Sequence, residues 1–182
     1  MQNNNEAHRD DITIGEESTA QYVRPALKTG HTIPDFRLMS VEGAAISPTD
    51  YKGRKNLVII FFDAHSSSDL VMLSLVGRRY QEIADDNAEV LAISVGPIDE
   101  LQTCAADFHF QFPLLSDMHS QAACSYCVVG SMIFVADKFG ELKMQSDISE
   151  ANIDEKLDKA LSALELIELE CPECGVSTWP VE

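Results

Sequence analysis

The stretch that decides the fold is a run of seven residues, Asn56-Leu57-Val58-Ile59-Ile60-Phe61-Phe62. Most of its side chains are β-branched or aromatic, and none is charged. This composition is typical of a strand that is buried on both faces, as the central strands of α/β sheets are. The sequence therefore predicts a central buried strand over 56–62.

The turn after this strand has the composition of a helix start. Ser66, Ser67, Ser68 and Asp69 can each accept a hydrogen bond from the unpaired N–H groups in the first turn of a helix. Beyond them, apolar residues recur at three- and four-residue steps and predict an amphipathic helix over 70–84. The strand thus leads directly into a helix N-terminus, a position where active-site residues are often found.

Strands and helices continue to alternate along the chain. The other expected elements are an opening hairpin or irregular strands at 32–53, a buried strand at 89–95, helices at 98–108 and 119–127, a hairpin at 132–136 and 140–144, and a final helix from about 149. Apolar residues form one stripe on that final helix: Ile153, Leu157, Ala160, Leu161, Leu164 and Ile167. The strand–helix–strand order implies right-handed crossovers, and therefore parallel pairing of the first two buried strands.

Five short motifs stand in a characteristic order: Ile33-Pro34-Asp35-Phe36-Arg37-Leu38, Ser47-Pro48-Thr49-Asp50-Tyr51-Lys52-Gly53-Arg54, Val90-Leu91-Ala92-Ile93-Ser94-Val95, Phe112-Pro113-Leu114-Leu115-Ser116-Asp117 and Phe134-Val135-Ala136-Asp137-Lys138-Phe139-Gly140-Glu141-Leu142. In this order they resemble the peroxiredoxins, the alkyl hydroperoxide reductase and thiol-specific antioxidant (AhpC/TSA) branch of the thioredoxin fold. The resemblance covers Thr32 to about Leu166. It implies an α/β fold of the thioredoxin-like, peroxiredoxin type, with a central mixed sheet flanked by helices.

The turn after the central strand departs from the resembled family. Peroxiredoxins carry there a proline, a threonine or serine and the peroxide-attacking cysteine, and these places fall on Asp63, Ser67 and Leu70. If the turn is aligned with the Cys-x-x-Cys of thioredoxins, the two places fall on Ser66 and Asp69. No cysteine lies between Asp63 and Leu70. The usual peroxidatic cysteine is therefore expected to be lacking, although the fold is kept.

Composition limits the partners. The chain has 182 residues, and 13 Lys and Arg against 30 Asp and Glu give a net charge of −17. A nucleic-acid backbone or an anionic membrane surface would repel such a protein, so we expect no nucleic-acid partner and no membrane association. The resemblance implies instead a protein thiol or disulfide partner or a peroxide-type small molecule, without a cofactor, and it allows a homodimer.

Three segments are expected along the chain. Residues 1–22 are polar, lack an apolar core and are predicted to be a disordered tail, 23–169 form the redoxin domain, and 170–182 form a C-terminal tail. No signal peptide and no apolar run of membrane-spanning length is recognisable, so a cytoplasmic location is the default expectation. Four of the five cysteines fall in two Cys-x-x-Cys pairs, which agrees with a reducing compartment.

The first pair, Cys124 and Cys127, is expected at the end of the short helix over 119–127. A spacing of three places both sulfurs on one helical face, where a disulfide or a shared metal is sterically open. A helix C-terminus disfavours thiolates, however, because of the helix dipole. Core packing, redox work and metal binding all remain open for this pair.

The second pair lies in Cys171-Pro172-Glu173-Cys174-Gly175, which resembles the knuckle of zinc ribbons and rubredoxins. One knuckle supplies two ligands, so a closed metal site would need the first pair as well. The alternatives are a redox dithiol that exchanges with disulfides and an inert or disulfide-linked tail. If the final helix packs as in thioredoxin, it carries Cys171 away from Cys124, which favours the redox hypothesis over a metal site within one subunit.

Cys104 lies within the helix over 98–108 and is expected to be a buried apolar residue rather than a reactive thiol. His65 is expected to be a solvent-facing loop histidine. Ser131 stands where a thioredoxin has its cis-proline.

Two functional hypotheses follow. The first is a peroxiredoxin-like thiol–disulfide oxidoreductase or antioxidant protein whose catalytic cysteines are Cys171 and Cys174 or Cys124 and Cys127. The second is a redoxin-fold binding or scaffold protein without catalysis, with a cysteine-pair tail that can bind zinc.

Overall fold

Strand β3 (Asn56–Phe62) lies inside the sheet, and all of its residues are buried. The computed structural model describes residues 27–169. Within them, seven strands form one mixed sheet in the order β2-β1-β5-β4-β3-β6-β7. Strand β3 pairs in parallel with β4 (Ala88–Ser94) and antiparallel with β6 (Met132–Ala136). The predicted central strand and its parallel neighbour are confirmed.

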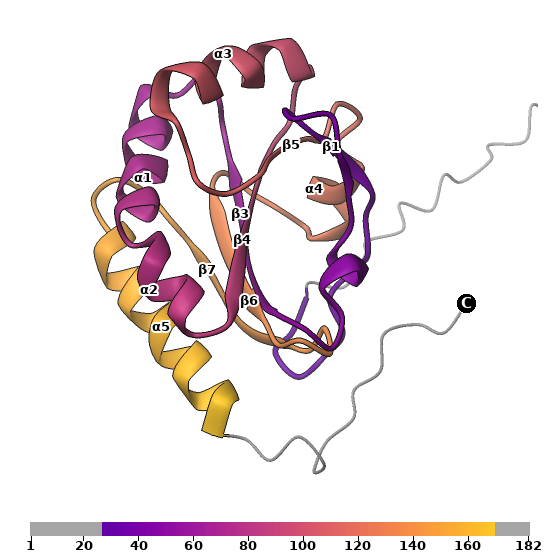
Figure 1. The fold of residues 1–182 in the computed structure, drawn as a ribbon, viewed down its shortest axis with the longest axis vertical. Helices are drawn as coiled ribbons and strands as arrows, with labels where there is room; N and C mark the ends of the chain where they lie inside the picture. Colours follow the sequence, from indigo (N-terminus) through magenta and orange to yellow (C-terminus); the bar gives the residue numbers. More distant parts are fainter. Residues whose placement is uncertain (1–26, 170–182) are drawn as a thin grey trace, which may run out of the picture.

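The other elements complete an α/β arrangement (Figure 1). They are β1 (Leu38–Ser40), β2 (Ala45–Ile46), the 3-10 helix η1 (Pro48–Tyr51), α1 (Ser67–Arg78), α2 (Tyr80–Asp85), α3 (Ile98–Phe108), β5 (Leu114–Ser116), α4 (Gln121–Ser125), β7 (Leu142–Asp147) and α5 (Ile153–Leu169). Between residues 27 and 169, every helix is too short or too polar to cross a membrane.

Alternate side chains of β3 belong to two cores. Val58 and Ile60 pack with buried residues of α1, α2, α3 and α5. Leu57 and Ile59 pack instead with Tyr126, at the end of α4, and with the segment before β1. In Figure 1, α1, α2 and α5 lie on one side of the strands, and α4 lies on the other. The sheet is thus covered on both faces, as its uncharged central strand requires.

Helix α5 runs alongside β3, from the carboxyl end of that strand to its amino end. The six residues of its predicted stripe are all buried. Just before the helix, the Ile148 N–H donates to the Ser131 carbonyl at 2.9 Å, near the carboxyl end of β3. At its far end, Nδ2 of Asn56 donates to Glu168 Oε1 at 3.0 Å, at the amino end of β3. The expected direction of the last helix is confirmed.

The helix predicted over 70–84 is two helices in the structure. Helix α1 begins earlier, because the Ser66 side chain caps it by accepting from the Asp69 N–H. It ends before Arg79, whose φ of −101° and ψ of 7° depart from helical values. Arg79 instead forms ion pairs with Glu82 at 2.9 Å and with Asp158 at 2.7 Å. Through these ion pairs, Arg79 connects the end of α1 to both α2 and α5.

The late hairpin also differs from the prediction. Asp137 Oδ1 accepts the Phe139 N–H at 2.9 Å and the Glu141 N–H at 2.8 Å. These bonds hold 137–141 in a turn, so β7 begins at Leu142. Helix α5 starts at Ile153 rather than near 149, because a turn closed by the Ser149 carbonyl and the Asn152 N–H precedes it.

Removal of one buried side chain from β3 tests this architecture. The Ile60 side chain is fully buried in the helical core, so Ile60→Ala should lower the free energy of unfolding by roughly 2–5 kcal/mol. Val129→Ala, at a residue 82% exposed, is the control and should stay within about 0.5 kcal/mol of the parent. Chemical denaturation measures both, and a loss below about 1 kcal/mol for Ile60→Ala would contradict the two-sided burial of β3.

Candidate functional site

The turn between β3 and α1 is organised by the carboxylate of Asp69. Its Oδ2 accepts the Asp63 N–H at 2.9 Å and the hydroxyl of Ser131. Its Oδ1 accepts the Ser66 hydroxyl at 3.3 Å. The partial positive charge at the start of α1 therefore faces a carboxylate from the helix's own first turn.

Ser66 and Asp69 occupy the two places that the thioredoxin alignment gave to a dithiol. The structure brings them together, because the Asp69 N–H also donates to Ser66 Oγ at 3.3 Å. Ser131, at the cis-proline place, completes the group through its bond to Asp69. A hydroxyl–carboxylate pair thus stands at the helix N-terminus, and it has no sulfur to oxidise.

His65 faces solvent, as expected. Its side chain is 67% exposed, and its two ring nitrogens lie 3.3 Å from Asp63 Oδ1 and 2.9 Å from Glu100 Oε2. Because Glu100 lies in the first turn of α3, this imidazole links the turn to α3.

The first cysteine pair lies at α4, on the other side of the sheet from α1 and α5. Cys124 is an exposed residue of the helix, and Cys127 is half-buried beyond its end. The prediction that both sulfurs share one helical face is wrong, because α4 stops at Ser125 and Cys127 has a left-handed φ of 53°. Neither thiol forms a disulfide within residues 27–169.

A buried aspartate that the sequence did not single out fixes the start of α4. Asp117 Oδ1 accepts the Gln121 N–H at 2.9 Å, and Oδ2 accepts the Ala123 N–H at 2.8 Å. Asp117 closes the most specific family-like motif, so its position held a signal for this role. The carboxylate positions the short helix that presents Cys124.

The other end of α4 is fixed by a buried tyrosine. The Tyr126 hydroxyl donates to the Pro34 carbonyl at 2.8 Å. Its ring centroid lies 5.3 Å from that of Phe61 and 5.1 Å from that of Phe134. Burial raises the pKa of Tyr126 well above its usual value, so this hydroxyl remains a donor. Cys124 and Cys127 therefore flank a rigid anchor.

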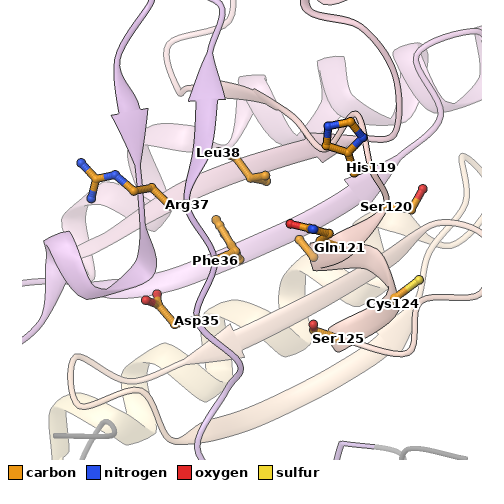
Figure 2. Close-up of a pocket in the computed structure, with 10 residues that line it drawn as sticks. Asp35, Phe36, Arg37, Leu38, His119, Ser120, Gln121, Cys124 and Ser125 are labelled. Carbon is orange, nitrogen blue, oxygen red and sulfur yellow. The ribbon is translucent and has the colours of Figure 1, made fainter. Parts of the chain in front are cut away.

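A hollow of about 440 Å³ lies beside Cys124, between the segment before β1 and α4. Figure 2 shows Cys124 on one side and Arg37 on the opposite side. The lining residues are Asp35, Phe36, Arg37, Leu38, His119, Ser120, Gln121, Ala122, Cys124 and Ser125. The hollow gives a small molecule a place next to an exposed thiol.

Cys104 is a core residue, as predicted. It is 7% exposed and packs among apolar side chains of α1, α3 and the sheet. Burial, with a smaller contribution from Asp107, raises the pKa of its thiol. Cys104 is therefore a poor nucleophile in the folded protein.

The second pair, Cys171 and Cys174, lies outside the described residues, as do the predicted tails at 1–22 and 170–182. Within 27–169, no cluster of three or more His, Cys, Asp or Glu side chains is arranged to hold a metal ion. The described chain ends at Leu169. This end lies near the amino end of β3, since the neighbouring residue Glu168 accepts a hydrogen bond from Asn56. The β3–α1 turn lies at the opposite, carboxyl end of β3.

Comparison with known proteins identifies relatives over the same region. A sequence model described as the AhpC/TSA family matches residues 29–145. Alkyl hydroperoxide reductase E of Mycobacterium tuberculosis is 31% identical over 115 residues, which are 62% of this chain and 75% of that protein. Thiol-disulfide oxidoreductase ResA of Geobacillus thermodenitrificans is 29% identical over 123 residues, which are 66% of this chain and 70% of that protein.

A solved structure supports the fold. The crystal structure of peroxidoxin BcpB from Mycobacterium tuberculosis superposes with a TM-score of 0.69 at 23% identity, and the match covers 78% of this chain and 98% of that one. The predicted thioredoxin-like fold of the peroxiredoxin type is confirmed.

Differential alkylation tests the contrast between two thiols. Cys124 is exposed and Cys104 is buried, so iodoacetamide should modify Cys124 well before Cys104 in the folded protein. Mass spectrometry of the digested protein after increasing times measures both. In denaturant the two rates should become similar, and equal rates in the native protein would contradict the burial of Cys104.

Peroxide kinetics test the β3–α1 turn. Because Asp63 to Leu70 offers no thiolate, we expect hydroperoxide consumption far slower than that of a peroxiredoxin with a cysteine in this turn. Stopped-flow measurement with hydrogen peroxide and an organic hydroperoxide gives the rate constants. Fast reduction that survives replacement of Cys124, Cys127, Cys171 and Cys174 by serine would show that another group attacks the peroxide.

Proposed function

The chain belongs to the AhpC/TSA family, and from this premise we propose that it is a peroxiredoxin-like thiol–disulfide oxidoreductase with a non-standard cysteine placement. Relatives named alkyl hydroperoxide reductase and thiol-disulfide oxidoreductase support a redox function. The observation that supports the placement is the bond between Ser66 and Asp69, in the turn where the resemblance to thioredoxins implies the usual thiols. The reactive sulfurs are then Cys171 and Cys174, or Cys124 and Cys127.

The reaction needs only a dithiol and an acceptor. The first thiolate attacks a disulfide RSSR, an S–S bond forms to the protein, and one RS⁻ leaves with the proton of the first thiol. The second thiol then attacks this mixed disulfide and releases the other RSH. The protein loses two electrons and gains an intramolecular disulfide. With a hydroperoxide as acceptor, the same dithiol would yield an alcohol and water.

Between the two pairs, Cys171 and Cys174 are the first choice. Buried side chains fix both ends of the helix that carries Cys124, and the half-buried Cys127 lies in a different backbone conformation beyond that helix. The second pair begins two positions after Leu169, the last residue of α5, so the restraints on α4 do not apply to it. We do not propose one metal site that uses both pairs in a single subunit, because α5 ends beside Asn56, at the amino end of β3, whereas α4 packs near the carboxyl end of that strand.

The proposed organisation is a redoxin domain over 23–169 with a polar segment at 1–22 and a cysteine-bearing segment at 170–182. Its acceptor is a protein disulfide or a peroxide-type small molecule. The cysteine usage fits a reducing compartment such as the cytoplasm. The scheme also allows a homodimer. In that arrangement Cys171 and Cys174 of one subunit would meet Cys124 and Cys127 of the other.

One observation favours the non-catalytic alternative. The carboxylate of Asp69 satisfies the start of α1 without any group that can be oxidised and re-reduced. A protein in which this substitution abolished catalysis would keep the redoxin fold as a binding scaffold. The two hypotheses differ in one measurable property, the transfer of two electrons to a disulfide.

A serine substitution tests the proposed dithiol. In the reduced protein, Cys174→Ser should trap a mixed disulfide on Cys171, because the thiol that would resolve it is gone. Mass spectrometry after incubation with a small aromatic disulfide measures the adduct. Cys127→Ser is the matched control, and an adduct that it alone traps, on Cys124, would assign the reaction to the first pair.

Two further outcomes of this experiment are distinct. If Cys171 and Cys174 are half of a metal site, Cys174→Ser should instead release zinc or iron and lower the melting temperature, since ligand binding contributes to folding free energy. A reduced parent protein that transfers no electrons to the disulfide would overturn the oxidoreductase proposal in favour of the scaffold.

A further inference from the structure

A ladder of aromatic rings runs from the core to the surface beyond the end of α3. Tyr80 and Phe112 are 5.7 Å apart between centroids, and Phe112 and Phe110 are 5.3 Å apart. Phe110 and Phe108 follow at 5.6 Å with almost parallel rings, at an interplanar angle of 5°. Phe108, the outermost ring, is 40% exposed. Stacked rings usually bury their faces, so the ladder ends on an unpartnered aromatic surface.

A hollow of about 310 Å³ lies between this surface and α1. It is lined by Ser74, Gly77, Arg78, Phe108, His109, Phe110 and Gln111. This volume is at the low end of the roughly 300–1,000 Å³ of small-molecule pockets, and it suits one aromatic side chain. Within residues 27–169 the guanidinium of Arg78 has no hydrogen-bonding or ionic partner, although the chain has a net charge of −17.

The segment 170–182 has the complementary chemistry. It contains the sole tryptophan of the chain, Trp179, together with Glu170, Glu173 and Glu182, and it has no lysine or arginine. A tryptophan stacks well on phenylalanine rings, and glutamates attract an unpaired arginine.

The hollow is within reach of this segment. Arg79 is next to the lining residue Arg78 and pairs with Asp158 of α5 at 2.7 Å. From Asp158 to the end of α5 at Leu169 is about 16 Å along the helix. From Leu169 to Trp179, the chain extends to at most about 33–36 Å. The span also includes the length of the Arg79 side chain, so the segment reaches the hollow when it returns along α5 in an extended form.

We propose that Trp179 docks into this hollow against Phe108 and Phe110 of the same chain, with nearby glutamates facing Arg78. Attachment through a short linker gives the tryptophan an effective concentration in the millimolar range, so a contact of modest intrinsic affinity is occupied. Docking fastens the segment on both sides of Cys171 and Cys174. It holds that pair on the helical face of the sheet, away from Cys124.

A second apolar hollow, of about 200 Å³, is the natural comparison. It lies at the carboxyl edge of β3 and is lined by Phe61, Phe62, Asp63, Ile93, Val95, Ala123, Val128, Gly130 and Ser131. Its one charged lining residue is Asp63, which repels a glutamate-rich segment. Val129, beside this hollow, therefore provides a control position.

Fluorescence of the full chain tests the proposal, because Trp179 is the only tryptophan. In the parent protein its emission should be blue-shifted and partly protected from acrylamide, compared with the same protein in denaturant. Phe108→Ala should lower the ratio of docked to undocked segment by about 3- to 10-fold. Arg78→Ala should lower it by about 1.5- to 5-fold, with less effect at high salt. Val129→Ala should leave the emission unchanged, and far-UV circular dichroism checks that each variant is folded.

Three results would overturn the proposal. One is native Trp179 emission and quenching equal to those in denaturant. Another is a response to Val129→Ala with none to Phe108→Ala. The third is protection that disappears on dilution, because it would mean that the segment docks on a second copy. None of these results depends on thiol chemistry, so the docking and the proposed function stand or fall separately.

Discussion

The whole structure depends on covering β3 from both sides. Its side chains alternate between two apolar layers, so neither the helical layer of α1, α2, α3 and α5 nor the layer around Tyr126 can be omitted. Burial also leaves its backbone groups to be satisfied by β4 and β6. The polar residue at its start, Asn56, is buried and uses its amide to join the β6–β7 turn and α5. The carboxyl end of the strand leads instead into an exposed turn.

At that exposed end, the strand leads into a turn and a helix N-terminus that are held together by a carboxylate. The helix start of α1 still attracts an anion, and Asp69 supplies one within hydrogen-bonding distance of Ser66 and the Asp63 N–H. A thiolate in this place would be stabilised by the same groups. The hydrogen bonds of Asp69 thus hold this turn, which contains no cysteine, in a defined conformation.

Most of the fold was predictable, because its signals are local and apolar. The run over 56–62 and the stripe on α5 each gave the correct element and the correct buried face. The break at Arg79 was not predictable, since the apolar spacing continues across it and Arg79 pairs with Asp158, far away in sequence. The left-handed backbone of Cys127 was not predictable either, because it lies directly after Tyr126, which is anchored to Pro34 far away in sequence. Spacing alone had placed its sulfur on a regular helix.

The anchored Tyr126 has a consequence for the redox potential of the pair around it. If closing a disulfide between Cys124 and Cys127 displaced Tyr126, its contacts with the rings of Phe61 and Phe134 and a buried hydrogen bond would be lost. The free energy of this local unfolding subtracts directly from the stability of the disulfide. A disulfide that cost these contacts would therefore be easier to reduce than one formed without such a loss.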